Sequence, residues 1–415
     1  MAHLLLLEVP GGNDFTVLED AIALGHSVTF VTGDLDQYRR QGEAIMTAMA
    51  KASRIIEVAP FSYAALERAV LTLHAETPVE AVLCILDIRM VEASQLAQRL
   101  GLAFLNPATT RMARDKVSVR ARLAERQVRQ PAFALVETAE DLTRAIAAIG
   151  YPVLIKPADG YASQNIHVLF SEGDLQPLVE RMAALARNPT DYGLGVQANN
   201  RYSVERYVRG AMIGCDVFTT RDRRIFLGVN DKAMLPPPSF AMRGSCFPST
   251  RHDTEAIRTY AFAILDAIDF DFGACHIEMI VAEDGPYLVE VNPRLVSAQI
   301  PFQLGYALER SLYADLIDLH LGRPLTALAE WTPRRLAAIR WMVAATPGTL
   351  SKIELPETAD PAICRVVIFK QPGETVRPPI QNGDRIGYVI AVGPTQADAE
   401  RIAEAYVAAT RIQVT

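Results

Sequence analysis

The sequence predicts a multidomain protein of mixed α/β and α+β class that begins with a doubly wound α/β domain. Three observations carry this prediction. The chain has 415 residues, which is too long for a single hydrophobic core. Its first 110 or so residues alternate short apolar runs with helical segments, as βαβ units do. The residues after about 333 are instead rich in short strands with glycines at the turns.

Composition narrows the class of protein. Half of the residues are apolar, 21% are charged, and the formal net charge is −7. This is typical of a soluble globular protein, and without a basic surplus we expect no nucleic-acid partner. No apolar run has the length of a membrane span, and the apolar N-terminus lacks the basic flank of a signal peptide. The five scattered cysteines indicate reduced thiols, so we expect a cytoplasmic protein. Because no apolar run is long enough to span a membrane, we also expect no membrane partner.

The N-terminal region repeats the order strand, helix, strand. We expect these elements, beginning with a strand, at residues 3–8, 15–24, 27–31, 54–58, 62–75, 79–86, 89–100 and 102–105. Asn13 or Asp14 is expected to cap the first helix, and the glycine pair before it does not form the GxGxxG dinucleotide pattern. Glu8 and Asp87 stand at strand ends, where a ligand contact is conceivable, but a capping or surface role is the favoured interpretation.

The second region contains a lysine placed as in a phosphate clamp. Its expected elements are a helix containing Asp115-Lys116, a strand, a helix, a strand ending in a lysine and a further strand, at residues 107–127, 132–136, 139–149, 151–157 and 166–170. Lys156 ends a buried strand and precedes a loop of small residues. Its ammonium would meet phosphate oxygens while the amides of Ser163, Gln164 and Asn165 close over them. The alternative is a solvent-facing lysine before an ordinary hairpin.

The next stretch offers a backbone edge for a planar ligand. After a helix at 174–187 and a polar loop, residues 202–210 are extended, and a strand follows at 212–219. The backbone of such a segment could hydrogen-bond to the edge of an adenine ring while the Val208 side chain packs on the face of the ring. The alternative is a plain linker strand. Residues 235–250 then form a long loop without regular pattern, followed by a helix at 253–268. Arg243 in this loop is a candidate for gripping an anionic substrate, although a surface role is equally consistent.

A hairpin at residues 276–294 carries the clearest chemical signal. Glu278 and Glu290 each stand inside a short apolar strand, and Asn292 shares a strand face with Glu290. Oxygen ligands on one side of a hairpin suit Mg²⁺ held with nucleotide phosphates, and Arg294 would clamp a carboxylate or phosphate oxygen. A surface hairpin with solvated acids is the alternative, but it explains Glu290 poorly because a half-buried unpaired charge is costly.

The remaining residues show no catalytic constellation. We expect a helix, three strands and a last helix at residues 309–321, 336–344, 362–370, 386–392 and 395–408. This region is expected to serve closure, substrate shaping or oligomer contact.

Taken in order, these motifs resemble the ATP-grasp superfamily of carboxylate–amine ligases, and the layout is closest to its L-amino-acid ligase branch. The matching stretches contain Asp115-Lys116, Ile155-Lys156-Pro157, Glu205 to Gly210, and Ile277-Glu278 with Glu290 to Arg294. The resemblance implies an ATP-grasp fold with an N-terminal α/β domain, a lid subdomain, a central subdomain holding Mg-ATP and a C-terminal α+β subdomain, at residues 1–112, 113–205, 206–325 and 326–415.

The resemblance also assigns roles to individual residues. Lys116 and Lys156 would bind ATP phosphates, Glu205, Tyr207 and Val208 would hold adenine, and Arg294 would stabilise an acyl phosphate. Mg²⁺, for which Mn²⁺ could substitute, would be bound by Glu278, Glu290 and Asn292. The substrates would be a small carboxylic acid and an amine, in peptide, natural-product or siderophore biosynthesis, and the family habit is a homodimer.

The sequence departs from the family at several positions. Met212 stands where many relatives carry a ribose-binding acid, which leaves Asp216 as a weak candidate, and Val296-Ser297 replace a glycine pair. His276, on the same strand face as Glu278, is a candidate for orienting substrate. Two alternatives therefore stay open: a kinase-like or carboxylase-like member of the superfamily, and a nucleotide-binding regulator without turnover.

Overall fold

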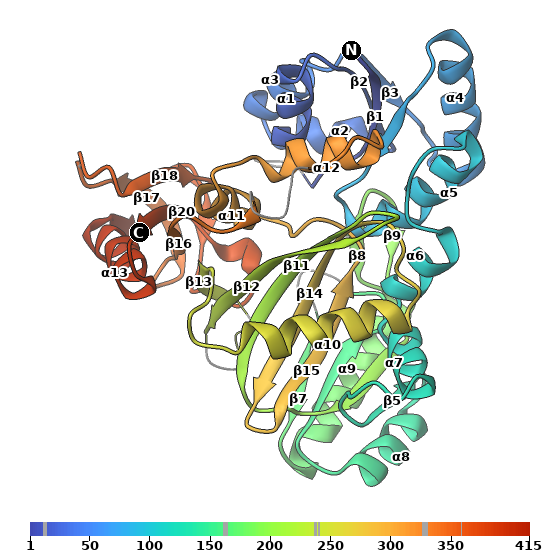
Figure 1. Ribbon diagram of the computed structural model, residues 1–415. Helices are drawn as coiled ribbons and strands as arrows, with labels where there is room; N and C mark the ends of the chain where they lie inside the picture. Colours follow the sequence, from blue (N-terminus) through green and yellow to red (C-terminus); the bar gives the residue numbers. More distant parts are fainter. Residues whose placement is uncertain (11–14, 161–164, 236–238, 240, 326–330, 358) are drawn as a thin grey trace.

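The leucine run near the N-terminus forms an inner strand of a parallel sheet, where Leu4 to Leu7 are fully buried. The computed structural model describes residues 1–10, 15–160, 165–235, 239, 241–325, 331–357 and 359–415 (Figure 1). The sheet has the order β3-β2-β1-β4 and confirms the predicted N-terminal α/β domain. Its elements are β1 His3–Leu7, α1 Thr16–Ala23, β2 Ser27–Thr32, α2 Leu35–Arg39, α3 Glu43–Met49, β3 Arg54–Glu57, α4 Tyr63–Glu76, β4 Ala81–Leu83, η2 Asp87–Arg89 and α5 Met90–Leu100.

The predicted fifth strand at 102–105 is wrong, because this stretch is irregular. Gly101 ends α5 in the left-handed conformation, with φ of 70°. The apolar residues after it are explained by packing: Leu105 is buried, and the ring of Phe104 lies 5.0 Å from that of His320. The expected cap residues Asn13 and Asp14 lie outside the described residues.

The next sheet is antiparallel with four strands in the order β5-β10-β6-β7, and it is called the lid sheet below. The helix expected at 107–127 is two helices, because Asp115 interrupts it and caps the second by accepting from the Ser118 amide. The polar loop before β10 contains a short hairpin that the sequence did not indicate. The elements are α6 Pro107–Arg114, α7 Lys116–Glu125, β5 Phe133–Val136, α8 Ala139–Ile149, β6 Val153–Pro157, β7 His167–Leu169, η3 Glu172–Asp174, α9 Leu175–Arg187, β8 Asp191–Gly193, β9 Val196–Gln197 and β10 Tyr202–Arg206.

An eight-stranded antiparallel sheet of order β15-β14-β11-β12-β13-β16-β20-β18 runs through the rest of the molecule. Figure 1 shows α10 crossing one face of β11, β12 and β14, with α13 packed at the far end of the sheet. Its elements are β11 Ala211–Thr219, β12 Arg224–Met234, β13 Met242–Phe247, α10 Thr254–Ala267, β14 Gly273–Ala282, β15 Gly285–Asn292, α11 Ile300–Leu308, α12 Leu312–His320, β16 Leu336–Met342, β18 Ile363–Ile368, β20 Gly387–Gly393 and α13 Gln396–Ala409.

One expectation for this half of the chain is wrong, and another is confirmed as α12 but misses the helix before it. The stretch 235–250 contains strand β13, which pairs with β12 and β16 and so joins the C-terminal region to the central sheet. The helix expected at 309–321 is preceded by a separate helix, α11, with Pro301 in its first turn, and Glu309 in the left-handed conformation separates the two. A smaller sheet completes the region with β19 Thr375–Val376, β17 Gly348–Glu354 and β21 Arg411–Val414, and η5 spans Asn382–Asp384.

All five cysteines are free thiols, and four of them are buried. Within the described ranges, no helix combines the length and the apolar character that crossing a membrane requires.

Candidate functional site

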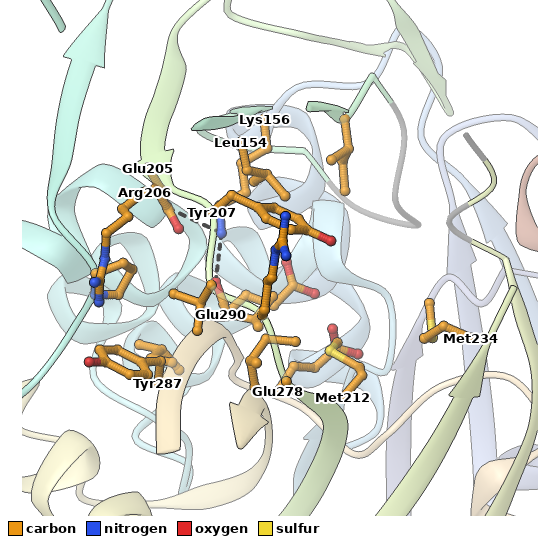
Figure 2. A pocket seen from close by; sticks show the side chains of 18 of the residues that line it. Leu154, Lys156, Glu205, Arg206, Tyr207, Met212, Met234, Glu278, Tyr287 and Glu290 are labelled. Atoms are coloured by element: carbon orange, nitrogen blue, oxygen red, sulfur yellow. Dashed lines mark hydrogen bonds and ion pairs between the residues drawn. The ribbon is translucent and has the colours of Figure 1, made fainter. Parts of the chain in front are cut away.

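A cavity of about 690 Å³ lies between the lid sheet and the β14–β15 hairpin (Figure 2). The hinge that follows β10 forms one wall, and the end of β6 and the hairpin form others. Its lining includes seven of the residues singled out from the sequence, namely Lys116, Lys156, Glu205, Tyr207, Val208, Glu278 and Glu290. The structure therefore brings together residues that lie up to 174 positions apart (290 − 116).

The hairpin places its two carboxylates directly opposite each other. In the β14–β15 ladder Glu278 faces Glu290, and His276 faces Asn292. The turn lies at residues 283–284, and Gly285, with φ of 120°, is already the first residue of β15. A ladder irregularity after Glu278 lets Val289 turn its carbonyl toward the lid.

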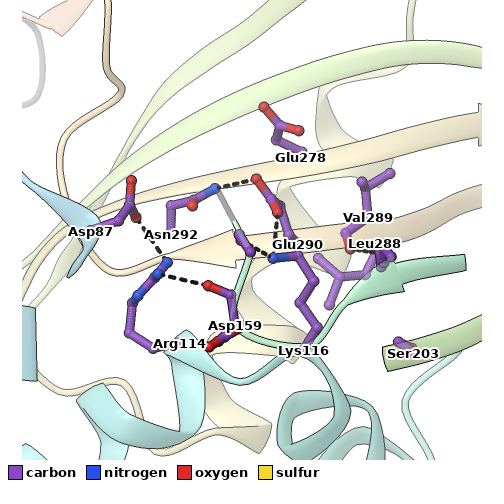
Figure 3. Close-up of polar contacts among 12 residues, drawn as sticks. Asp87, Arg114, Lys116, Asp159, Ser203, Glu278, Leu288, Val289, Glu290 and Asn292 are labelled. Atoms are coloured by element: carbon purple, nitrogen blue, oxygen red, sulfur yellow. Dashed lines mark hydrogen bonds and ion pairs between the residues drawn. The ribbon is translucent and has the colours of Figure 1, made fainter. Parts of the chain in front are cut away.

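Each hairpin carboxylate meets a lysine from another segment. Glu290 Oε2 lies 3.2 Å from Lys116 Nζ, and Asn292 donates its amide to Glu290 Oε1 at 3.1 Å (Figure 3). Glu278 is hydrogen-bonded to Lys232 of β12. Burial raises the pKa of Glu278, but Lys232 and His276 outweigh it and hold that pKa well below its usual range. Both carboxylates therefore face cations inside the cavity.

Lys156 forms the lid-side wall of this cavity. Its ammonium donates to the carbonyl oxygen of Val289 at 2.8 Å and lies 3.2 Å from Glu205, whose carboxylate also accepts from Arg120 at 2.8 Å. Burial lowers the pKa of Lys156 to about 8, against the opposing effect of Glu205. The pKa of Glu205 falls to about 2 despite burial, because two cations face one carboxylate.

Arg120 was missed in the sequence, although its spacing of four residues from Lys116 puts both on one helix face. Its guanidinium is fully buried and also donates to the carbonyl oxygen of Leu288 at 2.7 Å. Glu205, which we expected at adenine, is thus held by two basic residues at the edge of the cavity. Arg120 ties the lid strand β10 to the hairpin.

The hinge wall is apolar and suits a planar ring. Tyr207 and Val208 lie there with Leu154, Leu288 and Met212. The amide of Tyr207 already donates to the carbonyl oxygen of Pro152 at 3.0 Å. Met212 of β11 lines the cavity, whereas Asp216, the acid of the same strand, does not.

Asp216 and His276 lie behind the cavity and not in its lining. Asp216 is 2% exposed, and its Oδ1 lies 3.1 Å from His276 Nδ1, which excludes the ribose contact we considered. His276 Nε2 lies 3.1 Å from Lys232 Nζ, and the geometry does not support the expected substrate contact. Burial lowers the pKa of His276, but Asp216 outweighs it and raises that pKa. Lys232 went unnoticed because one lysine in a strand of mixed character carries no pattern.

Arg294 is anchored by the N-terminal domain. Its Nε donates to Asp87 Oδ2 at 2.7 Å. Arg114 donates to the other oxygen, Asp87 Oδ1, at 3.1 Å (Figure 3). Burial raises the pKa of Asp87, but the two guanidinium groups outweigh it and lower that pKa. The surface or capping role favoured for Asp87 is therefore wrong. Glu8 is likewise no surface acid, since it is fully buried against Arg89 at 2.6 Å.

Three remaining candidates lie away from the cavity or outside the described residues. Arg243 stands on β13, more than half exposed, and pairs with Glu404 at 3.3 Å, so the expected substrate grip is not supported. Asn165 donates to Thr190 at 2.8 Å and does not line the cavity. Ser163 and Gln164 fall outside the described residues.

Sequence models of three protein domains match successive parts of the chain. They are the ATP-grasp N-terminal domain over residues 18–104, the ATP-grasp domain over 149–301, and the L-amino acid ligase C-terminal domain 2 over 340–415. The second match contains Lys156, the hinge and the hairpin. The chain is an ATP-grasp protein. Its C-terminal region matches the L-amino acid ligase C-terminal domain 2.

Known proteins resemble this ATP-grasp protein over most of its length. The crystal structure of an L-amino acid ligase from Bacillus licheniformis superposes with a TM-score of 0.81 at 17% identity, covering 100% of this chain and 99% of that one. Uncharacterized protein y4rH of Sinorhizobium fredii is 29% identical over 74% of this chain and 63% of its own length. Carnosine synthase 1 of Gallus gallus is 25% identical over 62% of this chain. The chain thus spans 63% and 29% of these two relatives.

The ATP-grasp family uses ATP with Mg²⁺, and the oxygen donors of this protein fit such an ion. Glu278 and Glu290 are cross-strand neighbours, and Asn292 contacts Glu290. In the described part of the chain, no group of three or more His, Cys, Asp or Glu side chains has metal-binding geometry. Two carboxylates and an amide leave positions that phosphate oxygens and water fill, as is usual for Mg²⁺.

Proposed function

We propose that the protein is an ATP-dependent carboxylate–amine ligase that joins an amino acid or another small acid to an amine. One observation carries the proposal: the opposed carboxylates Glu278 and Glu290 share the cavity with lysines from three separate segments. The L-amino acid ligase C-terminal domain at 340–415 favours this chemistry over the kinase-like and carboxylase-like alternatives.

The proposed reaction has two steps. A carboxylate oxygen of the acid attacks the γ-phosphorus of ATP, the bond to the β–γ bridging oxygen breaks, and an acyl phosphate and ADP result. The amine then attacks the acyl carbon, phosphate leaves, and the amine loses a proton to give the amide. No protein nucleophile is needed, so the side chains contribute charge and position.

Each cation has a place in this scheme. Lys116, Lys156 and Lys232 converge on the cavity and would neutralise the phosphate oxygens. Arg294, held by Asp87, would stabilise the acyl phosphate from the edge of the hairpin. Mg²⁺, held by Glu278, Glu290 and Asn292, would supply the remaining positive charge when it is bound.

The hinge supplies the nucleotide's other contacts. Tyr207 and Val208 would enclose adenine together with the apolar side chains of Leu154 and Leu288. The cavity of about 690 Å³ matches the size range of nucleotide and cofactor sites. No acid at Met212 is available for ribose, so we expect weak discrimination between ATP and its 2′-deoxy form.

The test is an ADP-release screen over pairs of amino acids with Mg²⁺, with products identified by mass spectrometry. ADP release that depends on a second amino acid, with a product of condensed mass, supports the ligase. ADP release with a phosphorylated product and no amide favours a kinase. Tight ATP binding without turnover for any pair contradicts the proposed enzyme.

A further inference from the structure

Asp216 and His276 form a buried pair that does not line the cavity. His276 nevertheless contacts Lys232, whose side chain does line it. Asp216 is 2% exposed and His276 3%. His276 Nδ1 lies 3.1 Å from Asp216 Oδ1, and its Nε2 lies 3.1 Å from Lys232 Nζ. A histidine whose two ring nitrogens face a carboxylate and an ammonium is fixed in both tautomer and rotation.

Lys232 is the one member of this chain of contacts that reaches the cavity. Its ammonium also hydrogen-bonds to Glu278, whose carboxylate lies 3.5 Å from His276 Nε2. A lysine side chain has four rotatable bonds, so fixing its ammonium at one position costs considerable conformational entropy. Two fixed acceptors reduce the number of positions that the ammonium can take.

The strand pairing makes room for this arrangement. Asp216 of β11 pairs with His276 of β14, and Gly214 pairs with Glu278. A Cβ on Gly214 would lie 2.6 Å from His276 Cε1 and 3.0 Å from Lys232 Cε. The imidazole and the lysine stem therefore pass over the one residue of β11 that has no side chain.

We propose that Asp216 and His276 are positioning residues that hold the Lys232 ammonium toward the nucleotide phosphates. They touch neither nucleotide nor substrate and act through Lys232. Their contribution is to phosphate affinity and not to adenosine affinity. This inference rests on the nucleotide site of the proposed function, but not on the ligase reaction.

The experiment measures the affinity of a non-hydrolysable ATP analogue with Mg²⁺, and separately of adenosine, by calorimetry. His276→Phe keeps a ring of similar volume without its nitrogens and should weaken the analogue about tenfold, as the loss of one charge-assisted hydrogen bond does. Adenosine affinity should stay unchanged. His276→Gln, which restores an acceptor near Nε2, should recover binding to within about threefold.

A double-mutant cycle separates positioning from general packing. Combining His276→Phe with Lys232→Met should weaken the analogue no more than Lys232→Met does alone, because the histidine acts through the lysine. Gly214→Ala should weaken the analogue in the same direction, since its Cβ displaces the imidazole. His320→Phe is the matched control: this buried histidine packs between Phe104 and Phe272, and its replacement should leave both affinities unchanged.

Three results would overturn the inference. They are an unchanged analogue affinity in folded His276→Phe, an equal loss for analogue and adenosine, and additive losses in the double variant. Failure of the ligase screen with the pattern of affinities intact would contradict the proposed reaction and leave the positioning role standing.

Discussion

Two clusters of opposite charge, one at the end of the N-terminal sheet and one beside the cavity, differ in how far they are enclosed. At the end of the N-terminal sheet, Glu8 and Arg89 are 0% and 2% exposed and 2.6 Å apart. Beside the cavity, Glu290 and Glu278 pair with lysines, but each carboxylate remains 21% exposed. Both clusters pair a glutamate with a basic side chain, whereas only the second opens onto a cavity.

The N-terminal cluster is closed by its own neighbours. Glu8 accepts from the hydroxyl of Thr32 at 3.1 Å and from the amide of Gly33 at 2.6 Å, besides Arg89. Arg89 in turn donates to the carbonyl oxygen of Leu194 at 2.6 Å, and so docks the β8–β9 hairpin of the lid on this domain. Both side chains are enclosed, so neither is accessible to a ligand, and the cluster joins two parts of the chain.

The cavity cluster keeps capacity for further oxygens. Its lysines contact one or two carboxylate or carbonyl oxygens each, and an ammonium offers three donors. An ion pair that is enclosed by other protein groups has a structural role. In a pair that faces an open cavity, either side chain can instead bind a ligand. The comparison makes distinct predictions for substitutions in the two clusters.

The largest expected effect is on turnover in the cavity cluster. Glu290→Ala removes a proposed metal ligand and the partner of Lys116, so ADP release with a productive substrate pair should fall at least about 1000-fold. The matched control is Glu283→Ala, an exposed acid in the turn of the same hairpin, which should retain the wild-type rate. Unchanged ADP release in folded Glu290→Ala would refute the metal assignment.

The next largest effect is expected in the N-terminal cluster, on stability and not on nucleotide binding. Arg89→Leu leaves Glu8 buried without a cation, which should lower the free energy of unfolding by about 3–5 kcal/mol. Chemical denaturation followed by tryptophan fluorescence measures the loss. The nucleotide affinity of the folded variant should equal that of the wild type. A selective loss of nucleotide affinity at unchanged stability would show that this cluster too is a ligand site.

The pair of Asp87 and Arg294 joins the two regions and should have an intermediate effect. Asp87→Asn keeps the shape but loses the charge that orients the guanidinium, so kcat should fall about 10–100-fold, as for other side chains that orient a functional group. The KM for ATP should change little. A changed KM with an unchanged kcat would place Arg294 at the nucleotide and not at the reacting carboxylate.

A smaller effect follows from the pKa of Lys156, which is about 8 in the free protein. Bound phosphates favour the charged ammonium and raise this pKa, so nucleotide binding is at full strength below pH 8. Above pH 8 binding requires proton uptake, and affinity should fall by up to about tenfold per pH unit. Calorimetry between pH 7 and 9.5 tests this slope. Lys156→Arg should abolish it, because a guanidinium keeps its charge.

The smallest effect is expected outside both clusters. Arg243→Ala removes a pair with Glu404 in which both side chains are about half exposed. Such pairs contribute little, so stability should change by less than about 0.5 kcal/mol and KM values should not change. A raised KM for the acid substrate alone would restore Arg243 as a substrate contact.

The sequence by itself determined the elements whose signal is local. An acid inside an apolar strand, and a lysine at the end of one, indicated Glu278, Glu290 and Lys156 before any contact was known, because strand alternation assigns each side chain to a face. The alternation of strands and helices likewise determined the N-terminal α/β domain. Where apolar residues packed without forming a strand, as at 102–105, the same reasoning failed.

Only the tertiary structure decided which charges are partners. Asp87 and Arg294 are 207 residues apart, and Lys232 reaches Glu278 across β11 because Gly214 lies between them. Partner choice depends on strand order and register over the whole sheet, which neighbouring residues do not encode. Burial is also a property of the complete fold, so Glu8 and Glu290 become distinguishable only when one is enclosed and the other faces a cavity.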